Sequence, residues 1–124
     1  MDAEARIEEY YRALEAGDPL GPFFADGDDV VKFGISERLV GGTEVRRGLR
    51  EQTERTDDWR VDSRALRVVD RDCHAWFSDD VVLSWRDVAA ETRHRFETRW
   101  SGTLEARDGD GAFVGMHVST ARSF

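Results

Sequence analysis

The chain has 124 residues, enough for one hydrophobic core and too few for two domains. Acidic residues outnumber basic ones by 26 to 18, and the formal charge of −8 makes nucleic acids and anionic membranes poor candidate partners. The apolar runs are too short to span a bilayer, and residues 1–6 are acidic, unlike a signal peptide. We therefore expect one cytoplasmic domain over residues 1–124.

Cysteine, lysine and aspartate usage narrows the possibilities further. Cys73 is the only cysteine, which excludes an internal disulfide and metal sites built on cysteine pairs. Lys32 is the only lysine, beside 17 arginines and 15 aspartates, a balance typical of a salt-adapted cytoplasm such as that of a halophilic archaeon. Residues 108–111 resemble the start of a calcium loop, but Phe113 and Ser119 replace its glycine and its closing glutamate. We expect no metal and no cofactor.

The first quarter of the chain predicts two helices. Ala3, Ile7, Tyr10 and Leu14 have the spacing of one helical face, and Gly17 ends that helix. Asp18 and Pro19 then predict a second, short helix that runs into residues 23–25.

The middle of the chain predicts a strand and a third helix. Residues 26–29 form an acidic turn, and Val30, Val31, Phe33 and Ile35 read as a strand. After a break at residues 41–42, Thr43 can cap a helix that ends near residues 57–58. The buried stripe of this helix is expected to contain Val45, Leu49 and the stem of Gln52 or Thr53.

From residue 59 onward the pattern changes from helical to alternating. We expect a strand over residues 59–69 with an irregularity at 63–65, then residues 73–85 as one long bent strand or as two short ones that meet at 79–80. Residues 92–104 alternate cleanly, and a turn at 108–111 leads into a last strand over 112–120. The order predicts an α+β fold in which N-terminal helices pack on a strongly curved antiparallel sheet, a cone-shaped half-barrel with a pocket at one end.

Six short motifs follow one another along nearly the whole chain. They are Glu-Tyr-Tyr-Arg-Ala-Leu-Glu-Ala-Gly-Asp at 9–18, Phe-Phe-Ala-Asp at 23–26, Gly-Thr-Glu at 42–44, Ala-Trp-Phe-Ser at 75–78, Arg-Trp-Ser-Gly at 99–102 and Val-Gly-Met-His-Val-Ser at 114–119. In this order they resemble the SnoaL-like group of the nuclear transport factor 2-like superfamily. The resemblance implies a cone-shaped fold, a homodimer packed through the outer sheet surface, and a pocket between sheet and helices.

The same resemblance implies little about activity, because the superfamily includes isomerases, cyclases, dehydratases, transport factors and oligomerisation domains. In its ketosteroid-isomerase-like members a helix tyrosine donates to an oxyanion and a strand acid is the base. Tyr10 matches the tyrosine. The base position falls near Phe33 or Gly34 and the second acid near Trp100, none of which is a carboxylate, so the resemblance does not carry that mechanism over.

Three residues are candidates for acid–base or hydrogen-bonding roles. Tyr10 could donate to a ligand oxygen, and His94 and His117 could act as general acids or bases. For each of them, a structural side chain with its hydrogen bonds satisfied is the favoured alternative. Strand parity places His117 on the face of Phe113, and the family pattern favours that face pointing inward.

Arginines and tryptophans supply the remaining candidates. Arg93, Arg95 and Arg99 share one strand face that could clamp an anion or lie in solvent, and the resemblance favours Arg99 inside. The four tryptophans, Trp59, Trp76, Trp85 and Trp100, could stack on a planar ligand or fill the core and the dimer surface.

The expected function is therefore the binding of a small hydrophobic or aromatic ligand that carries one polar or anionic group. The expected ligand-binding residues are Tyr10, Phe33, Trp59, Trp76, Arg99, Trp100 and His117. One alternative is a cofactor-independent isomerase, lyase or cyclase in which a histidine is the base and Tyr10 the oxyanion donor. Another is an oligomerisation module.

Overall fold

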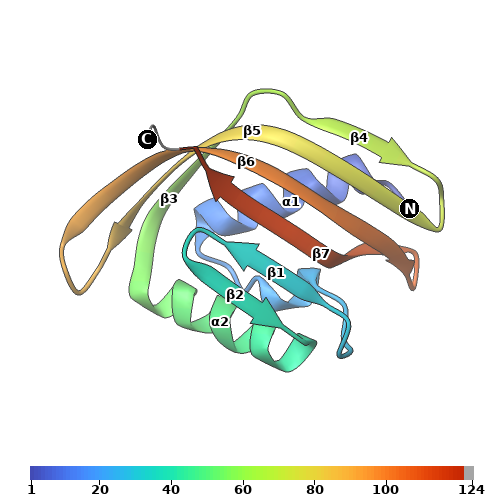
Figure 1. Cartoon of the computed structure of the whole chain (residues 1–124), viewed down its shortest axis with the longest axis horizontal. Helices are drawn as coiled ribbons and strands as arrows, with labels where there is room; N and C mark the ends of the chain where they lie inside the picture. Colours follow the sequence, from blue (N-terminus) through green and yellow to red (C-terminus); the bar gives the residue numbers. More distant parts are fainter. Residues whose placement is uncertain (122–124) are drawn as a thin grey trace.

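The computed structural model describes residues 1–121, in which two α-helices and one short 3₁₀-helix accompany a seven-stranded sheet (Figure 1). The elements are α1 (Ala3–Ala16), η1 (Gly21–Phe23), β1 (Val31–Gly34), β2 (Glu37–Val40), α2 (Gly42–Arg55), β3 (Thr56–Ser63), β4 (Arg67–Asp70), β5 (His74–Asp87), β6 (Thr92–Arg107) and β7 (Asp110–Thr120). Within the described residues, no helix combines the length and the apolar character needed to cross a bilayer.

Both ends of α1 are capped, and Gly17 ends the helix where the sequence predicts. At its start, Asp2 accepts a hydrogen bond from the amide of Ala5 at 3.1 Å. At its end, Gly17 has a φ of 75°, a left-handed conformation that glycine adopts without strain. Its apolar face, with Ile7 and Tyr10 at its centre, is buried against the sheet.

The next two helices differ from expectation at their starts. The predicted helix that begins at Asp18 and Pro19 is absent among the described residues. The chain instead forms one 3₁₀ turn at Gly21–Phe23, with Pro22 near the start of this turn. Helix α2 begins at Gly42, directly after Gly41, whose φ is 89°. Thr43 therefore lies inside the helix and does not cap it.

The strands form one curved sheet in the order β2-β1-β7-β6-β5-β3, and β4 also pairs with β5. All pairings are antiparallel except that of β1 with β7, which is parallel and corrects the expectation of a purely antiparallel sheet. Residues 74–87 form one continuous strand, β5. Residues 59–69 are divided between β3 and β4, and the break at residues 64–66 overlaps the irregularity expected at 63–65.

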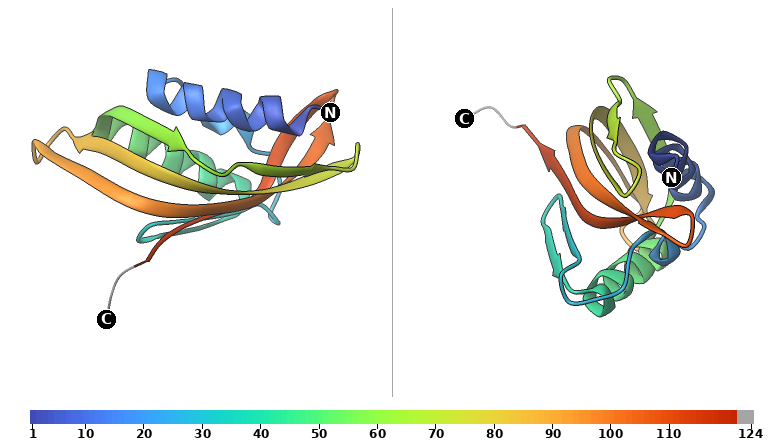
Figure 2. Two further views of the ribbon diagram at one scale, coloured as in Figure 1. Left: turned by 90° about the horizontal axis from the view of Figure 1, so that it is seen from above. Right: turned by 90° about the vertical axis from the view of Figure 1, so that its right-hand side faces the viewer.

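Both helices lie on the concave side of the sheet, as the two views of Figure 2 show. Helix α1 packs on β3, while α2 packs on β2 and β3. The core between them is closed by fully buried side chains from β6 and β7, including Leu104 and Phe113. The predicted α+β class with helices on a strongly curved sheet is confirmed, and the concave side is where a cavity remains.

Candidate functional site

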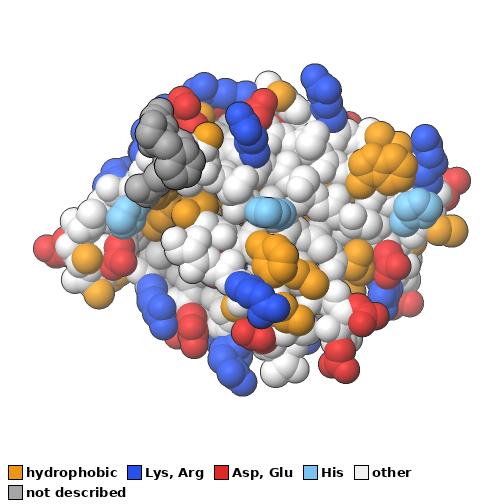
Figure 3. Space-filling view, viewed as in Figure 1, with side chains coloured by type: hydrophobic (Ala, Val, Ile, Leu, Met, Phe, Trp, Pro, Cys, Tyr) orange, Lys and Arg blue, Asp and Glu red, His pale blue; other side chains and the backbone are white. Residues whose placement is uncertain are grey.

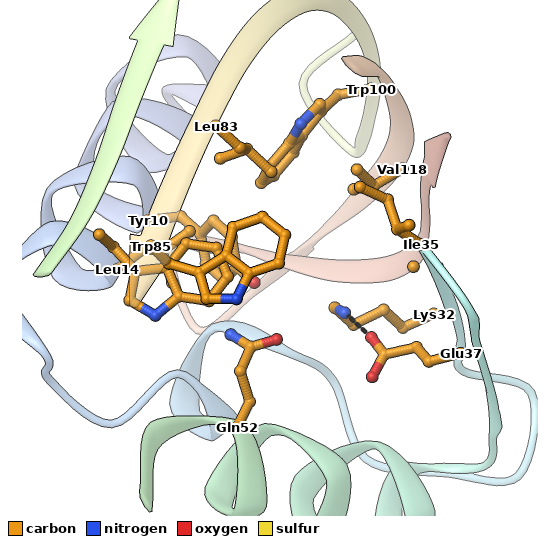
Figure 4. Close-up of a pocket in the computed structure, with 12 residues that line it drawn as sticks. Tyr10, Leu14, Lys32, Ile35, Glu37, Gln52, Leu83, Trp85, Trp100 and Val118 are labelled. Carbon is orange, nitrogen blue, oxygen red and sulfur yellow. Dashed lines mark hydrogen bonds and ion pairs between the residues drawn. The ribbon is translucent and has the colours of Figure 1, made fainter. Parts of the chain in front are cut away.

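A cavity of about 100 Å³ lies on the concave side of the sheet, between α1, α2 and the β1–β2 hairpin (Figure 4). Its lining residues are Tyr10, Leu14, Lys32, Gly34, Ile35, Glu37, Gln52, Trp59, Leu83, Trp85, Trp100 and Val118. They come from segments far apart in the sequence, so the cavity depends on the curvature of the whole sheet.

The cavity has a buried floor and a partly exposed mouth. Tyr10, Leu83 and Trp100 at the floor are at most 4% exposed. Gln52, Trp59 and Glu37 are half-buried, which places them where the cavity meets solvent. A ligand that enters past Trp59 would therefore be partly exposed to solvent at the mouth and shielded from solvent at the floor.

Two stacked indoles form one wall. The rings of Trp59 and Trp85 lie 4.7 Å apart between centroids, at an angle of 17°. A β-bulge in β3 makes this stacking possible, because Asp58 and Trp59 together stand opposite the single residue Trp85, with Asp58 at a φ of 51°. The Trp59 indole Nε1 donates to Thr56 Oγ1 at 2.8 Å, which fixes its ring.

Trp100 and Tyr10 form the floor. Their ring centroids are 6.2 Å apart in an edge-to-face arrangement, and Tyr10 also meets Phe113 edge-on at 5.2 Å. The Trp100 indole Nε1 donates to Thr98 Oγ1 at 2.9 Å, so this nitrogen is already satisfied inside the protein.

An ion pair between Lys32 and Glu37 lies at the wall opposite the indoles (Figure 4). In the β1–β2 hairpin Lys32 pairs with Leu39 and Gly34 pairs with Glu37, so all four residues share the concave face. A Cβ at position 34 would come within 2.6 Å of Glu37 Oε1, which means that the glycine leaves the space that the carboxylate occupies. Lys32 is only 5% exposed.

The hydroxyl of Tyr10 forms no hydrogen bond with any described residue, although the residue is 1% exposed. No polar side-chain atom that is fully enclosed by the described residues lacks a hydrogen-bond partner, so the hydroxyl oxygen of Tyr10 is not fully enclosed. Because Tyr10 lines the cavity, this oxygen faces the cavity. Burial raises the pKa of Tyr10 above its ordinary value, and the negative charge of Glu37 raises this pKa further. Tyr10 is therefore a neutral hydrogen-bond donor in the cavity.

Gln52 adds an amide to the mouth of the cavity. Its side chain points from α2 toward Trp85 (Figure 4). An amide can donate and accept, so it can bind either a carbonyl or a hydroxyl group of a ligand.

The carboxylate of Asp79 on β5 is buried, and its hydrogen-bond partners hold elements of the fold together. It accepts hydrogen bonds from Tyr11 Oη at 2.8 Å, Ser63 Oγ at 2.5 Å and the Ala65 amide at 3.0 Å. Burial raises the pKa of Tyr11, and the charge of Asp79 and its hydrogen bond raise it further. Asp79 thus connects α1 to the segment between β3 and β4 and is not among the cavity residues.

The structure divides the predicted ligand-binding residues between two faces of the sheet. Tyr10, Trp59 and Trp100 line the cavity. Phe33, Trp76, Arg99 and His117 do not, so these four predicted residues lie outside the cavity. The rings of Phe33 and His117 meet edge-on at 5.9 Å outside the cavity, and Arg99 and His117 border a shallow outer hollow of about 450 Å³.

A second β-bulge explains why the parity argument placed His117 wrongly. Thr103 pairs with Gly115 and Leu104 pairs with Phe113, so Val114 is an extra residue in β7. Beyond it the alternation changes phase. Phe113 and Val118 are both buried on the concave side, while His117 is exposed on the convex side.

The other candidates for chemistry lie outside the cavity. His94 contacts Trp85 at 5.2 Å between ring centroids but does not line the cavity. Cys73 is exposed. Within residues 1–121, no group of three or more His, Cys, Asp and Glu side chains is arranged to hold a metal ion.

The sequence interpretation missed Lys32 and Glu37 as site residues, while Trp85 was among the tryptophans that could stack on a ligand. Lys32 lies between the apolar residues Val31 and Phe33 of β1 and alternates with them, so it faces the cavity while they face the other side of the sheet. The available signal was the single lysine of a lysine-poor chain, located inside a strand. Gln52 was expected in the buried stripe of its helix, and it lines the cavity.

Comparisons with known proteins agree with this architecture. The model of a family described as SnoaL-like domain matches residues 3–123. No curated protein is similar enough in sequence to be matched.

Solved structures with the same fold are distant in sequence. A protein from Streptomyces avermitilis, named as a candidate dehydratase of the NTF2-like family, has a TM-score of 0.85 at 14% identity, covering 98% of this chain and 94% of that one. A candidate scytalone dehydratase from Novosphingobium aromaticivorans has a TM-score of 0.82 at 14% identity, covering 97% and 82%. A candidate calcium/calmodulin-dependent protein kinase type II association domain from Thiobacillus denitrificans has 0.76 at 20%, covering 96% and 94%. These likenesses concern the fold.

Proposed function

Because the chain belongs to the SnoaL-like domain family, we propose that it binds a small aromatic or similarly compact hydrophobic molecule carrying one hydrogen-bonding group. The observation that carries the proposal is the neutral hydroxyl of Tyr10, which has no partner among residues 1–121 and faces a cavity walled by Trp59, Trp85 and Trp100. Such a combination of apolar walls and one placed donor is typical of a small-molecule site.

The size of the cavity favours a ligand with a single ring. Its volume of about 100 Å³ is somewhat below that of an engineered apolar cavity of ~150 Å³ that holds benzene. The half-buried mouth at Gln52 and Trp59 leaves room for part of the ligand to extend outward. Larger ligands, with several fused rings, would require these side chains to move.

Recognition would combine apolar walls with one polar anchor. Trp59, Trp85 and Trp100 supply apolar contact area, which contributes in proportion to the surface removed from water. The hydroxyl of Tyr10 donates to an acceptor on the ligand, since this hydroxyl has no partner among the described residues. A ligand without an acceptor would leave that donor unsatisfied.

Titration calorimetry with benzamide tests the proposal, because benzamide has one ring and one carbonyl. We expect one site with a Kd of about 0.1–1 mM for so small a ligand. Val118→Phe, which fills the cavity from β7, should abolish binding, whereas His117→Phe on the opposite face of the same strand should leave it unchanged. Equal affinity in wild type and Val118→Phe would contradict the proposal.

An enzymatic reaction in the same cavity is a second candidate. It is favoured by one observation, that the carboxylate of Glu37 and the hydroxyl of Tyr10 face the same space and could serve as base and oxyanion donor. Neither His94 nor His117 lines the cavity, so a histidine base would have to come from outside it. An enzyme of this kind should lose turnover in Glu37→Gln while it still binds its substrate.

A homodimer through the convex face of the sheet is also part of the proposal. This face carries Trp76 with 44% of its surface exposed, and Figure 3 shows hydrophobic side chains spread over it. Exposed aromatic residues of this kind are enriched at protein interfaces. Sedimentation of the wild type and of Trp76→Arg would test it: we expect a dimer in the first and a monomer in the second.

A further inference from the structure

We infer that Glu37 is a specificity-determining residue, and that by neutralising Lys32 it makes the cavity selective for uncharged aromatic ligands over anionic ones. The inference rests on the proposed function, since it specifies the chemical class of the ligand in the same cavity. It concerns two residues whose place in the site is fixed by the β1–β2 hairpin.

The charge balance of the cavity is the first step. Lys32 and Glu37 are the two lining residues that carry a charge, and they form an ion pair with each other. The side chain of Lys32 is 6% exposed, so its ammonium is removed from water and depends on Glu37 for a counter-charge. The cavity therefore contains one positive and one negative group, and its net charge is zero.

The second step is the position of the carboxylate. Gly34, which faces Glu37 across the hairpin, has no side chain, and any Cβ there would come within 2.6 Å of the carboxylate oxygen. Glu37 thus occupies a space that the hairpin keeps open for it. Glu37 and the floor residue Tyr10 line the same cavity, and the negative charge of Glu37 contributes to the raised pKa of Tyr10.

The consequence for ligands follows from these two observations. A carbonyl or hydroxyl group can accept from Tyr10 without disturbing the ion pair. A carboxylate at the same place would be repelled by Glu37 in a site that is poorly screened by water, unless it displaced Glu37 from Lys32. Either way an anion binds at an additional cost that its neutral counterpart avoids.

A matched pair of ligands measures this cost. Benzamide and benzoate have the same ring and nearly the same shape, and they differ in charge. For the wild type we expect benzamide to bind at least about tenfold more tightly than benzoate in titration calorimetry at neutral pH. Equal affinities, or tighter binding of benzoate, would overturn the inference.

Two variants should shift this ratio in opposite directions. Glu37→Gln removes the negative charge and leaves Lys32, so benzoate should become the preferred ligand. Lys32→Met leaves the carboxylate of Glu37 alone, so the preference for benzamide should increase. A folded Glu37→Gln protein with an unchanged ratio overturns the inference. If Glu37→Gln does not fold, Lys32→Met decides, and an unchanged or smaller preference for benzamide there has the same meaning.

The measurements also separate the two levels of the argument. If none of the proteins binds either ligand, the proposed function is wrong and the inference fails with it. If the wild type binds both ligands equally and Val118→Phe binds neither, the cavity is a binding site and only the role of Glu37 is wrong.

Discussion

Lys32 on β1 and Glu37 on β2 form an ion pair at the concave face of the sheet, with the lysine almost completely buried. The two residues are connected by a hairpin turn in which Ser36 has a φ of 65°. A buried ion pair gives little net stability, because removing two charges from water offsets their attraction. Its presence in the wall of a cavity therefore favours a role in ligand recognition.

The two halves of this pair should differ in their contributions to stability. Glu37→Gln leaves a buried ammonium without a counter-charge and should lower the free energy of unfolding by about 2–4 kcal/mol. Lys32→Met leaves a carboxylate whose side chain is 29% exposed and can still reach water, so the loss should be about 1 kcal/mol or less. Urea unfolding of both variants checks this order. The opposite order would show that Glu37, not Lys32, depends on the pair.

Replacing Asp79 by asparagine should destabilise the fold. The amide would place a donor against groups that already donate to Asp79, including Tyr11 and Ser63, and we expect a loss of about 1–3 kcal/mol. Asp80→Asn is the matched control, since Asp80 is exposed on the other face and should change stability by less than about 0.5 kcal/mol. Similar urea midpoints for the two variants would refute the structural role of Asp79.

Glycine at position 102 should be needed for the packing of β6 on β7. A Cβ there would come within 2.6 Å of the carbonyl oxygen of Gly115 and 2.7 Å of Phe77, so Gly102→Ala should cost about 1–3 kcal/mol. Gly115→Ala, where a Cβ meets nothing within 4 Å, should be close to neutral. The prediction fails if thermal unfolding shows equal melting temperatures for the two alanine variants.

The two tyrosines of the chain should not ionise in the folded protein near their ordinary pKa of about 10. Burial raises both pKa values, with further contributions from Glu37 at Tyr10 and Asp79 at Tyr11. The unfolded chain loses these protons above about pH 10 while the folded chain retains them, so stability should fall as the pH rises above 10. Phenolate absorbance should therefore rise together with the loss of the circular dichroism signal. A rise near pH 10 in a fully folded protein would contradict the burial of the tyrosines.

The order of elements could be predicted from local patterns, because each pattern reports on one element. The spacing of Ile7, Tyr10 and Leu14 indicates a helix, and Gly17 ends it where the structure ends it. The alternation after residue 92 indicates β6, and its apolar members, Trp100 and Leu104 among them, face inward. Strand β2 was missed, since residues 37–40 show no apolar alternation of the usual kind.

The site could be predicted only in part, because irregular positions decide which side chains face the cavity. The bulge at Val114 turns His117 outward, and the only local signal is Gly115, because a glycine inside a strand can mark a bulge. Arg99 alternates with Trp100 on β6, so the inward position of the tryptophan requires the arginine to face outward. Lys32 faces inward for the same reason of parity, a position that the polarity of its side chain did not suggest.

The central claim is that the cavity on the concave face binds a small aromatic molecule, and the four tryptophans provide the most direct test. Trp59, Trp85 and Trp100 line the cavity, while Trp76 is exposed on the convex face and serves as an internal control. We predict that benzamide causes saturable shifts of the indole N–H signals of the three cavity tryptophans in NMR spectra of the labelled protein, without a shift at Trp76. Unchanged signals at all four, or a shift confined to Trp76, would contradict the account.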